Sequence, residues 1–250
     1  MVRGVVLEEI ERTKPDHILV MEHLHVVQAY LENYCKSLKD MMFLFEDPWL
    51  LRAMHRYLSM YHPLSPQRKR DVPRSAGHTC HTFMNIAEPL GERLQPMVLA
   101  AGRFPAAVPA SFLEELMSLL RVILDMRPGF YEEPAQGYKH NVYDSSTTLV
   151  ISLMMCVLFN GRQTDALLAA FEPLVPQVWA RYGRDSGDLP LQWKSLLLVL
   201  NVLRLKREAT PAMLQFASRH APRLLSETVA LAPLALRSPE FPPYFVQVLA

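Results

Sequence analysis

Hydrophobic positions recur at helical spacing along most of this chain. The clearest case is SFLEELMSLLRVILDM, residues 111–126, in which apolar residues fall three or four positions apart and so share one helical face. That face consists of Phe112, Leu116, Leu119, Leu120 and Ile123. Ser111 and Glu114 are three positions apart, which predicts a capping box at the start of the helix.

Prolines are expected mainly as helix starts and stops, as at Asp47-Pro48 and Thr210-Pro211. No strand is predicted. Helices are expected at residues 15–36, 38–45, 48–61, 80–87, 92–101, 111–126, 145–159, 164–171, 173–182, 191–206, 211–220 and 222–236. Polar connections occupy residues 62–78 and 127–144, and the first, a basic segment, is expected to be a flexible loop.

Two of the expected helices carry few polar residues. Residues 145–159 are apolar on nearly every face, and residues 191–206 have few polar interruptions, so each must be covered on more than one side. The run Thr147–Phe159 is also shorter than the roughly 20 residues that cross a bilayer, which favours a buried helix over a membrane span.

This pattern predicts an all-α fold. Short antiparallel helices with a nearly apolar member in each layer favour an armadillo- or HEAT-like α-solenoid of about ten to twelve helices, with repeats of roughly 40 residues. We expect one domain, residues 1–250. A single globular all-α bundle is the alternative, because no repeated signature decides between the two.

Composition restricts the partners and the compartment. Lys and Arg number 26 against 25 Asp and Glu, and this net charge of +1 predicts no general attraction to nucleic acid or anionic lipid. Three separated cysteines, Cys35, Cys80 and Cys156, do not form a disulfide framework and favour the reducing cytosol or nucleus. Acidic residues near the N-terminus argue against a signal peptide.

The segment GHTCHTF, residues 77–83, raises the question of a metal site. His78 and His81 could share a helical face, but Cys80 would point away from them. His23 and His25, two positions apart, would diverge on a helix. Because zinc usually takes about four ligands in two close pairs, and the second pair is missing, we expect no bound metal.

No catalytic motif is found. Asp185-Ser186-Gly187 in GRDSGDLP resembles the nucleophile segment of trypsin-like proteases, but those enzymes position it on β-barrels, and a loop between helices is expected here. The phosphate loop, the dinucleotide fingerprint, the lipase elbow and H-E-x-x-H are all absent from the sequence. We therefore expect no enzyme activity and no cofactor.

Charge is concentrated in QRKRDVPR, at Arg68, Lys69, Arg70 and Arg74. This segment is a candidate nuclear-import signal or phosphate contact, and a solvated loop is the alternative. Candidate aromatic anchors for a partner lie in the second connection, since aromatics are enriched in binding hot spots. They are Phe130, Tyr131, Tyr138 and Tyr143, which could equally cover the apolar helix that follows. Residues 238–250 are expected to cap the last repeat.

Two long segments, residues 146–183 and 189–208, resemble vertebrate armadillo-like helical proteins of the meiosis inhibitor type, specifically their C-terminal part. The resemblance extends over most of the chain and rests on no diagnostic motif. It implies a fragment or short isoform of a larger solenoid. It also implies a germ-cell nuclear scaffold that supports programmed DNA double-strand breaks and chromosome synapsis, with meiotic recombination factors as partners.

Three hypotheses follow. The first is a non-catalytic helical scaffold that binds other proteins, without direct contact to nucleic acid or membrane, and is nuclear if the resemblance holds. The second is a cytoplasmic adaptor or trafficking solenoid of the same fold. The third is a helical enzyme whose scattered His, Asp and Glu residues converge in a deep polar pocket.

Overall fold

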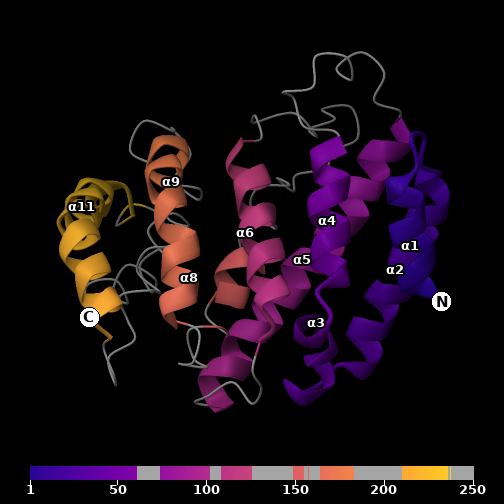
Figure 1. The fold of residues 1–250 in the computed structure, drawn as a ribbon, viewed down its shortest axis with the longest axis horizontal. Helices are drawn as coiled ribbons and strands as arrows, with labels where there is room; N and C mark the ends of the chain where they lie inside the picture. Colours follow the sequence, from indigo (N-terminus) through magenta and orange to yellow (C-terminus); the bar gives the residue numbers. More distant parts are fainter. Residues whose placement is uncertain are drawn as a thin grey trace. The chain divides into compact units, whose positions relative to one another are not determined.

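The computed structural model describes residues 1–60, 74–101, 108–125, 149–154, 157, 164–182, 210–235 and 237, and within them every regular element is helical (Figure 1). The all-α prediction is confirmed for this part of the chain. The chain forms two compact units, residues 1–160 and 161–250, which we describe separately. The single domain and the solenoid remain predictions.

The helices of unit 1 are arranged in two rows. They are α1 (Val2–Glu11), α2 (His17–Tyr34), α3 (Phe43–Glu46), α4 (Trp49–Met60), α5 (Arg74–Ala101) and α6 (Ala110–Asp125). Helix α4 packs between α1 and α6, and α2 packs on both α1 and α5. Figure 1 shows α1, α4 and α6 following one another across this unit. The helix expected at residues 38–45 is instead a 3₁₀ turn, Lys39–Met41, followed by α3.

Helix α6 confirms the face predicted from its periodicity. All five predicted core residues, from Phe112 to Ile123, have 0% exposure. The cap at Ser111 is wrong, because α6 begins at Ala110 and the Phe112 N–H donates to the Pro109 carbonyl at 3.0 Å. This bond places Ser111 inside the first turn.

The apolar stretch that follows is buried, as predicted. Residues 149–154 are helical, and none of them is more than 6% exposed. Ser152, its buried polar residue, donates its hydroxyl to the Gly91 carbonyl of α5 at 2.8 Å. The hydroxyl therefore satisfies its hydrogen-bonding need inside the core, where an unpaired polar group would cost about 1–3 kcal/mol.

Helix α1 was not anticipated from the sequence, and a buried carboxylate fixes its end. Glu9, 3% exposed, accepts the Asp16 N–H at 3.0 Å and pairs with Arg12. Asp16 in turn caps α2, since its Oδ1 accepts the N–H groups of Ile18 and Leu19, each at 3.1 Å. One chain of bonds thus closes the hairpin between α1 and α2.

Prolines interrupt fewer helices than predicted. Helix α5 runs through Pro89 and Pro96, where two shorter helices were expected, and it already includes residues 74–78 of the expected loop. Helix α11 (Pro211–Ala235) likewise runs through Pro222. An interior proline removes one helical bond and strains the preceding turn. In α5, burial of Ile86 (2% exposed), Leu90 (4%) and Leu94 (0%) offsets that loss.

Unit 2 contains α8 (Thr164–Phe171), a 3₁₀ turn (Glu172–Leu174), α9 (Val175–Tyr182) and α11. Helix α8 packs on α11, where the rings of Phe171 and Phe216 lie 6.1 Å apart. The predicted start of α11 is confirmed: the Thr210 hydroxyl accepts the Met213 N–H at 3.2 Å. Among the described residues of both units, no helix is long and apolar enough to cross a membrane.

Candidate protein-binding groove

Most residues singled out from the sequence lie outside the described ranges. This applies to the basic residues Arg68, Lys69 and Arg70 and to the aromatic residues Phe130, Tyr131, Tyr138 and Tyr143. It applies also to the loop 183–190, the helix expected at 191–206 and the expected cap at 238–250. Arg74 is the first residue of α5, and the structure does not describe its side chain. These assignments therefore stay predictions.

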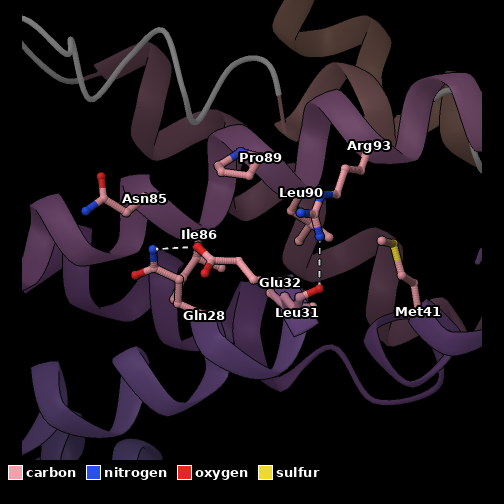
Figure 2. A pocket seen from close by; sticks show the side chains of 9 residues that line it. All are labelled: Gln28, Leu31, Glu32, Met41, Asn85, Ile86, Pro89, Leu90 and Arg93. Carbon is pink, nitrogen blue, oxygen red and sulfur yellow. Dashed lines mark hydrogen bonds between the residues drawn. The ribbon is translucent and has the colours of Figure 1, made fainter. Parts of the chain in front are cut away.

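A groove lies between α2 and α5 in unit 1 (Figure 2). Its lining residues are Gln28, Leu31 and Glu32 of α2, Met41 of the 3₁₀ turn, and Asn85, Ile86, Pro89, Leu90 and Arg93 of α5. We call these residues the α2–α5 groove. They come from segments that are far apart in the sequence. Leu31 and Arg93, for example, are 62 positions apart.

The floor of the groove is apolar and its edges are polar. Leu31, Met41, Ile86 and Leu90 are all buried, with at most 6% exposure. At one edge the Gln28 amide donates to the Glu32 carboxylate at 2.9 Å on the exposed surface of α2. The groove therefore combines an apolar contact surface with positioned donors and acceptors.

Two lining residues differ from those of a regular helix in the hydrogen bonding of their carbonyls. The Arg93 guanidinium reaches across from α5 and donates to the Leu31 carbonyl at 2.9 Å. Pro89 has no N–H, so the carbonyl of Asn85, four residues earlier, lacks its usual helical partner. The first interaction joins the two helices, and the second removes one helical hydrogen bond from α5.

The size of the groove limits its ligands. Its cavity volume is about 10 Å³, which is room for roughly one water molecule and far below the roughly 300–1,000 Å³ of typical small-molecule pockets. The groove is therefore a shallow surface for contact with a partner, and it cannot enclose a metabolite.

A second polar cluster joins α2, α4 and α5. The Tyr57 hydroxyl and His17 Nδ1 lie 2.7 Å apart, and the Thr79 hydroxyl donates to the His17 carbonyl at 2.9 Å. Burial lowers the pKa of the His17 imidazole below its ordinary value of 6.5, and the Asp16 carboxylate opposes this shift. The hydrogen bond between Tyr57 and His17 and the bond from Thr79 join α2, α4 and α5 at one point.

A third cluster links α4 to α6. Glu115 accepts from Arg52 at 2.7 Å and lies 3.3 Å from His55 Nδ1. All three side chains are partly exposed, between 18% and 29%. Their contacts join α4 to α6.

Unit 2 has its own polar cluster along α11. Glu172 pairs with Arg219 at 2.7 Å and lies 3.3 Å from His220 Nε2. The Arg223 guanidinium lies 5.3 Å from the centre of the Trp179 ring, and the buried indole N–H of Trp179 has no hydrogen-bond partner among the residues that the structure describes. The described residues of both units contain no group of three His, Cys, Asp or Glu side chains that could hold a metal ion.

Sequence reasoning missed the α2–α5 groove. The sequence shows Pro89 and predicts a helix at residues 15–36, but the proximity of these two segments follows only from packing. Comparison with protein-family models, with curated proteins and with solved structures gives no match for this chain.

Proposed function

We propose that this chain is a non-catalytic helical scaffold that binds other proteins, and that the α2–α5 groove is one binding site. The observation that carries the proposal is the groove itself, with its buried apolar floor and hydrogen-bonded polar edges. Side chains already fixed before binding lose little conformational freedom when a partner docks. A partner would pack an apolar side chain over the floor of the groove and align its polar groups with Glu32, Asn85 and Arg93.

The helix arrangement of unit 1 supports a solenoid as the underlying architecture. Helices α1, α4 and α6 follow one another in one row, while α2 and α5 pack side by side in the second. Stacked helical hairpins of this kind present long surfaces formed by successive helices of one row. We propose that α1–α2 and α4–α5 are such hairpins, and that the groove lies on the second row.

The resemblance supports a more specific role. The segments 146–183 and 189–208 resemble the C-terminal part of meiosis inhibitor protein 1, an armadillo-like protein. We therefore propose a nuclear scaffold in germ cells, with meiotic recombination factors as partners. The basic residues 68–70 would then contribute to nuclear import. The cytoplasmic adaptor is the competing hypothesis, and the helical enzyme would need a deep polar pocket that the α2–α5 groove does not provide.

The test is a pull-down with the full chain from testis extract and, in parallel, from a somatic extract, with mass spectrometry of the bound proteins. The groove variant is Glu32→Lys, which reverses a charge at the polar edge. Its matched control is Glu114→Lys, the same change at an exposed position of α6. Circular dichroism would establish that both variants are folded.

We expect a defined set of partners bound by the parent chain and by Glu114→Lys but lost from Glu32→Lys. Meiotic recombination proteins recovered from testis alone would support the nuclear scaffold. Vesicle or cytoskeletal proteins recovered from both extracts would favour the cytoplasmic adaptor. Partners retained equally by all three proteins would remove the groove as their binding site.

A further inference from the structure

A single carboxylate, that of Asp40, closes the turn that follows α2. Its Oδ2 atom accepts the backbone N–H groups of Lys36 at 3.1 Å and Ser37 at 2.8 Å, and also the Ser37 hydroxyl at 2.8 Å. The bond from the Ser37 side chain is the largest of the causes that hold the pKa of Asp40 below its ordinary value. The turn therefore depends on a hydroxyl proton that a modification of Ser37 would remove.

The surroundings of Ser37 match the substrates of one class of modifying enzyme. Ser37 and Asp40 are both exposed. Protein kinases select substrates by the charge pattern near the acceptor hydroxyl, and Asp40 lies three positions after Ser37, a spacing that acid-directed kinases read. Among the described residues, Thr13 and Ser111 also precede an acidic residue at this spacing, but neither hydroxyl is bonded to that residue. Ser37 is thus the position at which a phosphate would act directly on a structural carboxylate.

We propose that Ser37 is a phosphorylation site of an acid-directed protein kinase, and that its phosphate opens the turn after α2. In this step the Ser37 oxygen forms a bond to the γ-phosphorus of a nucleoside triphosphate. The bond to the leaving nucleoside diphosphate breaks, and the hydroxyl proton passes to a base of the kinase. The product carries a charge of about −1.5 to −2 at pH 7. Its oxygens are acceptors, so they do not replace the hydroxyl as a donor to Asp40.

Charge repulsion follows from the distance between the two side chains. The Ser37 oxygen lies 2.8 Å from Asp40 Oδ2, so in the closed turn the phosphate would lie against a carboxylate of the same sign. The neighbouring lysines, Lys36 and Lys39, are exposed, and ion pairs in water contribute little. Asp40 must therefore move away from Ser37, and the backbone N–H groups that donate to Asp40 lose their partner.

Opening of the turn would change the burial of two side chains. Cys35 is 1% exposed, and its thiol donates to the Asp40 carbonyl at 3.7 Å, so movement of Asp40 exposes the thiol. Met41 is fully buried on the floor of the α2–α5 groove, and the same movement displaces it. An effect of the phosphate on partner binding therefore rests on the proposed function of the groove, whereas exposure of Cys35 does not.

The first experiment tests the site. The full chain is incubated with ATP, Mg²⁺ and a serine kinase that selects an acidic residue three positions after the acceptor, and fragment mass spectrometry locates the phosphate. We expect a phosphate at Ser37, and we expect Asp40→Asn to lose it, because this variant lacks the charge that the kinase reads. Absence of phosphate at Ser37 in the parent chain would overturn the proposal, as would equal phosphorylation of Asp40→Asn.

The second experiment tests the opening. Maleimide labelling of Cys35, read by peptide mass spectrometry, compares the phosphorylated with the unmodified chain, and each rate is divided by that of the same sample in urea to remove the effect of charge on the thiol. We expect labelling to be roughly tenfold faster after phosphorylation. Ser37→Glu should change the rate in the same direction, and Ser59→Glu, at an exposed position of α4, should not. Equal rates before and after phosphorylation, with unchanged circular dichroism, would sink the proposed opening.

Discussion

The Tyr57 hydroxyl of α4 lies 2.7 Å from Nδ1 of His17, at the first residue of α2. The two rings meet edge-on with centroids 5.8 Å apart, and Tyr57 is fully buried. Because α4 and α2 belong to different rows of unit 1, this pair joins the rows at one end. The Thr79 hydroxyl brings α5 to the same point through the His17 carbonyl.

Removing the Tyr57 hydroxyl should destabilise the protein without changing its shape. We expect Tyr57→Phe to lower the free energy of unfolding by about 1 kcal/mol, because the His17 nitrogen loses a hydrogen bond in a partly buried position. Urea denaturation followed by circular dichroism measures the change. Tyr34→Phe, at a position 70% exposed, is the control and should leave the midpoint unchanged. Equal midpoints for all three proteins would contradict this account.

His17 should make stability depend on pH. Burial lowers its folded-state pKa below 6.5, so between that folded value and 6.5 the unfolded chain binds more protons than the folded chain. Stability therefore rises with pH through this window and is lost as the pH falls from 6.5 toward the folded value. Urea midpoints between pH ~5 and ~7.5 should show this slope in the parent chain. His17→Gln should reduce the slope, and His25→Gln, at an exposed position, should preserve it.

The Glu115 carboxylate should stabilise the contact between α4 and α6. Its bond to Arg52 is charge-assisted and partly shielded from solvent, so Glu115→Gln is expected to cost about 1–2 kcal/mol. The adjacent Glu114 is exposed on the same helix, and Glu114→Gln should change the unfolding free energy by less than about 0.5 kcal/mol. A difference within error between the two variants would mean that the ion pair contributes no net stability.

Cys35 should react slowly while the protein is folded. Its side chain is 1% exposed, and burial together with the nearby Asp40 carboxylate raises its pKa, which lowers the fraction of reactive thiolate. Labelling with a maleimide at neutral pH, read at Cys35 by peptide mass spectrometry, should be slow in buffer and fast in urea. Rapid labelling of the native chain at this residue would show that the turn after α2 opens readily.

Periodicity predicted helices well where one face is strongly apolar. Helix α6 is such a case, because its large side chains repeat through four turns and all face the core. Helix α1 was missed since VRGVV combines Gly4 with β-branched valines, which favour helix weakly. Its helix depends instead on Val6 and Ile10, buried at 0% and 4%, and on the bonds of Glu9. Tertiary packing here overrides local preference.

The boundaries at proline were the main error. A proline inside a segment predicts the end of a helix, because the free-energy cost of the lost hydrogen bond can be read from the local sequence. The burial that compensates for this cost depends on residues far along the chain. In α5 those residues include Leu31 and Met41 across the α2–α5 groove. The groove was missed for the same reason, since its two sides become neighbours only after α2 and α5 pack.

Pro89 affects the stiffness of α5 as well as its hydrogen bonding. A helix bends more easily where a proline removes a hydrogen bond, so residues 85–89 form one of two joints in α5, the other being at Pro96. The joint at residues 85–89 lies on the wall of the α2–α5 groove, and Arg93, beyond it, is tied to α2. A partner side chain that packs over the groove against Pro89 and Leu90 would limit bending at this joint. Occupying this small space would thereby stiffen a helix of 28 residues.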